Sequence, residues 1–85
     1  MKNIEIYTGP LCTFCDRAIA LLNKKGVSFK KIDLASDPNK IEDMIKKTNG
    51  MKTIPLIFVD GQHIGGNDKL QALENEGKLN SLLGV

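Results

Sequence analysis

Residues 4–15 read IEIYTGPLCTFC and contain the chain's only two cysteines, Cys12 and Cys15. The stretch begins as a short apolar strand and turns at Gly9-Pro10, which brings the cysteines to the start of the next element. That element is predicted to be a helix, because apolar residues recur there three and four positions apart. The pattern therefore predicts a strand–turn–helix unit with both thiols on the first turn of the helix.

Two thiols at this spacing can close a small disulfide ring. A helix N-terminus places unpaired backbone N–H groups and a partial positive charge beside the first sulfur. Such a setting lowers the pKa of a cysteine from about 8.5 into a range of about 3.5 to 7.5. Because the thiolate is the nucleophile in disulfide exchange, we expect Cys12 to attack a disulfide and Cys15 to resolve the mixed disulfide that forms.

Length and composition predict one small domain, residues 1–85, with a modest core. A formal charge of +2 and 5% aromatic residues do not indicate a nucleic-acid partner. We expect no membrane partner and a cytoplasmic protein, because no apolar leader precedes the first strand and no apolar run approaches ~18 residues. A structural disulfide is unusual in that compartment, so the cysteine pair favours catalysis, redox sensing or metal binding.

The remaining elements follow from apolar spacing and turn residues. The first helix is expected to end at Gly26, and a second strand to cover residues 27–34 with a bulge or an early end, because its apolar positions change phase. Asp37-Pro38 predicts the N-cap and first position of a second helix, which ends near Gly50.

The last third of the chain contains the clearest local signal, a β-hairpin. Its two strands are residues 56–59 and 62–64, joined by the two-residue turn Asp60-Gly61. Asn67 is expected to cap a third helix, and a short helix follows Gly77. A helix between the first two strands requires a parallel pair and the hairpin an antiparallel one, which predicts an α/β fold with a mixed four-stranded sheet flanked by helices.

Three signals in this order carry a resemblance to a known family. They are the C-x-x-C motif after the first strand, Thr53-Ile54-Pro55 before the third strand, and the stretch GGND at residues 65–68 after the hairpin. The chain resembles the glutaredoxins, specifically the short bacterial dithiol type, over nearly its whole length. The resemblance implies a thioredoxin fold, glutathione as the reducing co-substrate, and reduction of protein disulfides and glutathione-mixed disulfides by a monomer.

The resemblance also implies a glutathione site. Pro55 is expected to follow a cis peptide bond, and the backbone of Ile54 to pair with the cysteinyl part of glutathione. Free N–H groups at Asn67 and Asp68 would hold the γ-glutamyl carboxylate, while the Asp68 side chain attracts its ammonium group. The full set of expected glutathione-binding residues is Phe14, Thr53, Ile54, Pro55, Gly66, Asn67 and Asp68.

Two features depart from the family pattern. The family often has a lysine shortly before the first cysteine, whereas residues 8–11 read TGPL, so the glycyl carboxylate is left to Lys46, Lys47 or Lys52. Thr13 stands where dithiol glutaredoxins usually have proline. Family members with a small hydroxyl residue there include some that hold a [2Fe–2S] cluster, which makes a cluster carrier or sensor the alternative function. By analogy its ligands would be Cys12 from each of two subunits and two glutathione thiolates.

Two further readings of the cysteine pair remain. A zinc site needs about four ligands, and the only histidine, His63, is expected to be exposed on the hairpin, so we expect no protein-bound metal site. A glutaredoxin-like electron donor served by thioredoxin reductase would need no glutathione groove, whereas Asn67 and Asp68 indicate one.

Overall fold

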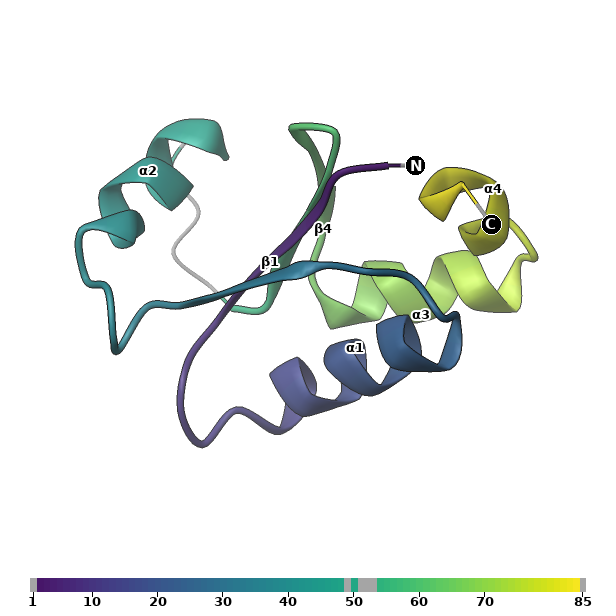
Figure 1. Cartoon of the computed structure of the whole chain (residues 1–85), viewed down its shortest axis with the longest axis horizontal. Coiled ribbons are helices and arrows are strands. Elements are labelled where there is room, and N and C mark those ends of the chain that lie inside the picture. Colours follow the sequence, from purple (N-terminus) through teal and green to yellow (C-terminus); the bar gives the residue numbers. More distant parts are fainter. Residues whose placement is uncertain (1, 49, 51–53, 85) are drawn as a thin grey trace.

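The computed structural model describes residues 2–48, 50 and 54–84 of the chain. Within these residues the elements follow one another in the predicted order (Figure 1). They are β1 (Ile4–Thr8), α1 (Thr13–Lys24), β2 (Lys30–Asp33), α2 (Lys40–Lys47), β3 (Leu56–Val59), β4 (Gln62–Gly65), α3 (Asn67–Asn75) and α4 (Leu79–Leu83). No helix in this part of the chain is both long and apolar enough to cross a membrane.

The four described strands form one mixed sheet in the order β2-β1-β3-β4. β1 pairs with β2 in parallel, and α1 makes the connection between them, as a parallel pair requires. β3 runs antiparallel to both β1 and β4. In the hairpin turn Asp60 and Gly61 both have positive φ, 52° and 82°, as a two-residue hairpin turn of this type demands. The predicted mixed sheet is confirmed.

The two faces of the sheet bury separate cores because side chains alternate along each strand. Ile4 and Ile6 of β1 pack among buried residues of α1, α3 and α4. Tyr7 points to the opposite face and packs with Phe58 and with Met44 of α2. Figure 1 shows this division, with α1, α3 and α4 gathered on one side and α2 standing apart.

Helix α1 is formed and ended by local signals that the sequence displays. Its buried side chains recur on one face, at Cys15, Ala18, Leu21 and Leu22. The helix stops before Gly26, whose φ of +72° an L-amino acid with a side chain adopts only at a cost. The cysteine pair is therefore attached to a helix that is anchored in the larger core.

Two predicted boundaries were wrong. The second strand begins at Lys30 rather than residue 27, because Val27 and Phe29 pack against the helix-side core instead of pairing with β1. The second helix begins at Lys40 with Asn39 as its N-cap, so Asp37 does not cap it. Asp37 belongs instead to a turn that leads into the helix, in which the N–H of Lys40 donates to the carbonyl oxygen of Asp37 at 3.1 Å.

Candidate active site

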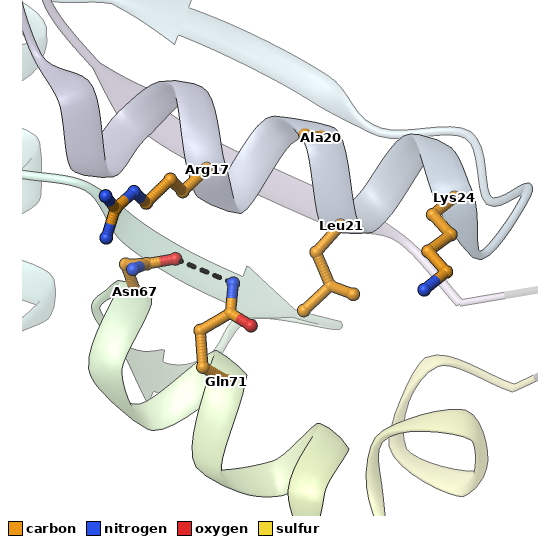
Figure 2. Close-up of a pocket in the computed structure, with 6 residues that line it drawn as sticks. All are labelled: Arg17, Ala20, Leu21, Lys24, Asn67 and Gln71. Atoms are coloured by element: carbon orange, nitrogen blue, oxygen red, sulfur yellow. Dashed lines mark hydrogen bonds between the residues drawn. The ribbon is translucent and has the colours of Figure 1, made fainter.

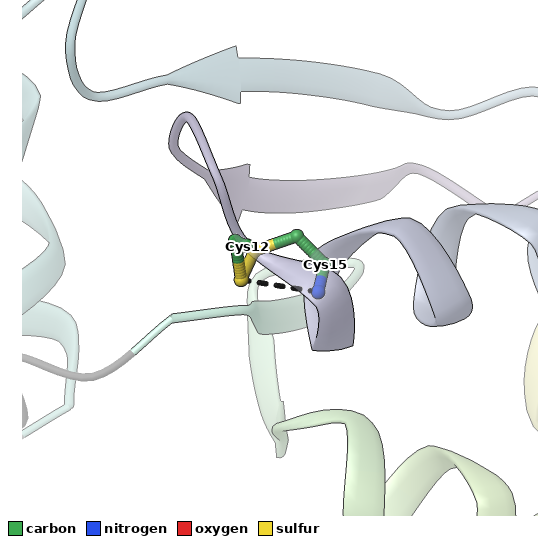
Figure 3. Close-up of a disulfide and its surroundings, with 2 residues drawn as sticks. All are labelled: Cys12 and Cys15. Carbon is green, nitrogen blue, oxygen red and sulfur yellow. Dashed lines mark hydrogen bonds between the residues drawn. A yellow bond between two sulfur atoms is a disulfide. The ribbon is translucent and has the colours of Figure 1, made fainter.

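Cys12 and Cys15 form a disulfide at the start of α1 (Figure 3). Cys12 is the N-cap, with extended backbone angles, and its Sγ accepts a hydrogen bond from the N–H of Cys15 at 3.1 Å. Cys15 is 1% exposed, whereas Cys12 is half-buried. Of the two sulfurs, the one at Cys12 is therefore the one that another molecule can approach.

The position of Cys12 has a chemical consequence once the disulfide is reduced. A hydrogen bond donated to the sulfur and the positive end of the helix dipole both favour the charged thiolate over the neutral thiol. Both contributions come from backbone N–H groups, so they need no neighbouring cation. This fits the sequence, because the described residues 8–11, directly before Cys12, contain no charged side chain.

A cleft lies beside the disulfide. The Ile54–Pro55 peptide bond is cis, as predicted, and Pro55 is buried where the chain enters β3. Six of the seven residues expected to bind glutathione line one hollow of about 300 Å³, together with Lys69. The six are Phe14, Ile54, Pro55, Gly66, Asn67 and Asp68. The seventh, Thr53, lies outside the described residues.

The far wall of the cleft is the start of α3, and here one prediction was wrong. Gly66, not Asn67, is the N-cap, and no side chain caps the helix. Asn67 is the first helical residue, is 6% exposed, and accepts a hydrogen bond at Oδ1 from Nε2 of Gln71, 3.2 Å away. Gly66 takes the cap position because α3 approaches Pro55 closely: a Cβ added at Gly66 would lie 3.1 Å from the Pro55 carbonyl oxygen.

Among the described residues that line the cleft the one cation is Lys69, which the sequence did not indicate. Nothing in the local pattern distinguishes it from other exposed lysines, because its place depends on how α3 packs against Pro55. Lys47 does not line the cleft: its Nζ donates a hydrogen bond to the Tyr7 hydroxyl at 3.2 Å, and this bond raises the pKa of Lys47. Lys46 is exposed and does not line the cleft, and Lys52 lies outside the described residues.

His63 is not the exposed strand residue that we expected. It is half-buried, and its ring lies 5.3 Å from the ring of Phe58, which stands opposite it in the hairpin. Its Nε2 is buried and has no hydrogen-bond partner among the described residues. Within those same residues no group of three or more His, Cys, Asp or Glu side chains lies together as a metal site would require.

Comparisons with known proteins agree with this geometry. Residues 4–64 match the Glutaredoxin family model. The chain is 51% identical to Glutaredoxin 3 of Escherichia coli K12 over 83 residues, which cover 98% of this chain and 99% of that protein.

Solved structures agree as well. A glutaredoxin from Brucella melitensis superposes with a TM-score of 0.80 at 46% identity, covering 95% of this chain and 87% of that one. A buckwheat glutaredoxin–glutathione complex superposes with a TM-score of 0.85 at 28% identity, covering 98% and 77%. The chain belongs to the glutaredoxin family of glutathione-dependent thiol–disulfide oxidoreductases.

Proposed function

We propose that Cys12 is the nucleophile of this oxidoreductase and Cys15 its resolving thiol. The observation that carries the proposal is the Cys12 sulfur, half-exposed at a helix start and hydrogen-bonded to the Cys15 N–H. With a glutathionylated protein, the Cys12 thiolate attacks the glutathione sulfur, the protein thiolate leaves, and a second glutathione reduces the enzyme–glutathione disulfide and departs as glutathione disulfide. With a protein disulfide, Cys15 instead attacks the Cys12–substrate disulfide, and two glutathiones then reduce the Cys12–Cys15 bond.

We further propose that the cleft beside Cys12 binds glutathione. The backbone of Ile54 offers strand-like hydrogen bonds to the cysteinyl unit. The N–H groups at the uncapped start of α3 suit the γ-glutamyl carboxylate, and the exposed Asp68 carboxylate suits its ammonium group. Lys69 supplies a cation for a carboxylate of the tripeptide. The proposal for Thr53 rests on the family resemblance alone.

Two cysteine variants test the division of labour. Cys12→Ser should abolish reduction of both substrate kinds. Cys15→Ser should keep reduction of a glutathionylated peptide, since glutathione resolves that intermediate, and should lose direct reduction of a peptide disulfide. Turnover is followed as NADPH consumption with glutathione and glutathione reductase. Equal loss of both activities in Cys15→Ser would show that the assignment is wrong.

The electron source is tested with the unmodified protein. Reduction of a glutathionylated peptide should proceed with glutathione and glutathione reductase and should fail with thioredoxin reductase in their place. Alkylation of reduced Cys12 by iodoacetamide, followed against pH, should show a midpoint below the value of about 8.5 that is usual for cysteine. A midpoint at or above that value would contradict the role of the helix N-terminus.

The second candidate function is a [2Fe–2S] carrier or sensor. What favours it is the surface around Cys12, where Leu11, Thr13 and Phe14 are all exposed, so a second subunit could approach the sulfur. The described residues alone do not supply four ligands, which is why the proposal includes a second Cys12 and two glutathione thiolates.

Anaerobic reconstitution with iron, sulfide and glutathione tests this second candidate. It should give a coloured dimer, and Thr13→Pro should abolish it. A colourless monomer in the unmodified protein would refute it. That the chain is a single domain that acts as a monomer in the cytoplasm stays a prediction.

A further inference from the structure

A second hollow lies between α1 and α3, outside the glutathione cleft (Figure 2). Its volume is about 450 Å³, and its lining residues are Arg17, Ala20, Leu21, Lys24, Asn67 and Gln71. We call these six residues the α1–α3 groove. Figure 2 shows Arg17 and Lys24 extending from α1 toward the groove and Asn67 and Gln71 extending from α3. None of the six has a role in the function proposed above except Asn67.

The charged residues that line the α1–α3 groove are both basic. Arg17 and Lys24 are both exposed, and neither forms an ion pair with any residue that the structure describes. A carboxylate of α3 nearby, Glu74, is neutralised by Lys25 at the C-cap of α1, whose Nζ lies 2.6 Å from its Oε1. The lining therefore offers two unpaired cations and no carboxylate.

The groove adjoins the glutathione cleft at a shared residue. Asn67 lines both hollows, so a chain that lies across Pro55 beside Cys12 can run on between the two helices. Arg17 stands at the junction, with its guanidinium 5.7 Å from the ring centroid of Phe14, a residue of the cleft. A ligand longer than glutathione would meet these cations next.

We propose that the α1–α3 groove binds an acidic segment of a protein disulfide substrate whose cysteine is joined to Cys12. The inference rests on the proposed function, because it needs the substrate to pass through the cleft. Along α1 the rise per residue places Arg17 about 7.5 Å and Lys24 about 18 Å from Cys12. An extended chain covers ~3.3 Å per residue. Its acidic residues should therefore lie between about the second and the sixth position from the target cysteine.

Two symmetric peptide disulfides test the inference. One peptide has Glu at the second, third, fifth and sixth positions on each side of a single cysteine, and the other has Gln at those positions. Reduced enzyme is mixed with each disulfide without glutathione, and the release of two peptide thiols per oxidised enzyme gives a rate constant. An exposed ion pair changes a binding equilibrium by about 1.4- to 5-fold, so two pairs predict a preference for the Glu peptide of about 2- to 25-fold. The preference should fall as salt is raised.

Three double variants give the decisive comparison. R17Q/K24Q should remove the preference, whereas R17K/K24R, which keeps both charges, should retain it. K30Q/K31Q removes the same charge from the exposed lysines of β2 and should also retain the preference. Equal rates for the two peptides in the unmodified protein, or equal loss of preference in R17Q/K24Q and K30Q/K31Q, would overturn the inference. If neither peptide is reduced at all, the proposed function itself fails.

Discussion

A long-range hydrogen bond joins helix α2 to the sheet, and its removal should have a measurable cost. The Nζ of Lys47 donates to the Tyr7 hydroxyl at 3.2 Å and lies 5.7 Å and 5.5 Å from the ring centroids of Tyr7 and Phe58. Tyr7→Phe keeps the ring and removes the acceptor of this bond, while the exposed Lys47 ammonium can bind water in its place. We therefore expect Tyr7→Phe to lower the free energy of unfolding by only the net value of one hydrogen bond, about 0.5–1.5 kcal/mol.

Lys47→Met keeps the aliphatic stem but removes both the hydrogen bond and the cation–π contacts. Its expected cost is about 1–2 kcal/mol, kept low because the Lys47 side chain is exposed and solvent screens its charge. The double variant should cost less than the two single variants together, by a coupling energy of about 0.5–1.5 kcal/mol. In a domain of this size that energy corresponds to about 2–12 °C in melting temperature.

Urea unfolding of the four proteins measures the coupling, and the pH dependence tests its origin. The bond to Tyr7 raises the pKa of Lys47 above its usual 10.5 in the folded state. A raised pKa gives a stabilisation that is complete below the unfolded value and is lost only as the pH rises through the folded value. The coupling should therefore be constant from pH 6 to 9. No coupling, or a coupling that changes within this window, would refute the assignment, and Lys46→Met combined with Tyr7→Phe should be additive.

The other predictions concern the core and the edges of the cleft. Leu70 is fully buried, so Leu70→Ala should cost about 2–5 kcal/mol in urea unfolding, and the half-buried Leu73→Ala should cost clearly less. Leu11 is fully exposed and has a φ of +52°, a backbone conformation that asparagine tolerates better than other side chains. Leu11→Asn should therefore stabilise the protein by about 0.5–1 kcal/mol, whereas Leu11→Val should not. Equal melting temperatures of the two variants would count against backbone strain at this position. Gly66→Ala should raise the KM for a glutathionylated peptide, because the new Cβ would crowd the Pro55 carbonyl oxygen, and an unchanged KM would show that the cleft adjusts.

The parts of the fold that local chemistry determines could be predicted from the sequence. The helix after the cysteines follows from apolar spacing and Gly26, and the hairpin follows from Asp60-Gly61 between two apolar runs. The start of α2 could not be predicted, because Asp37 and Asn39 are both good N-cap residues, and the turn at residues 37–40 makes the helix begin after Asn39. The position of that turn depends on where β2 ends, which tertiary packing decides.

The candidate site also contains residues that could be predicted from the sequence and residues that could not. Cys12, Cys15 and Pro55 stand in short motifs, so their importance is visible in the sequence. Lys69 and the α1–α3 groove are not visible, because each needs two segments distant in sequence to pack side by side. His63 was misjudged for a related reason: alternation along β4 is clear, but the Phe58 ring that covers it becomes its neighbour only through the hairpin register.

In this molecule the residues that stabilise the fold differ from those that we propose to recognise a substrate. Two features anchor the cysteine pair. Cys15 is buried, and the rest of α1 packs in the helix-side core. The groups that we propose to face a substrate, Phe14, Arg17 and Lys24, are exposed and bury little apolar surface. Because stability arises mainly from buried apolar surface, polar substitutions at these exposed positions should leave the melting temperature nearly unchanged. The same substitutions should change which disulfides are reduced, so substrate preference can vary among related chains while the reactive geometry at Cys12 is preserved.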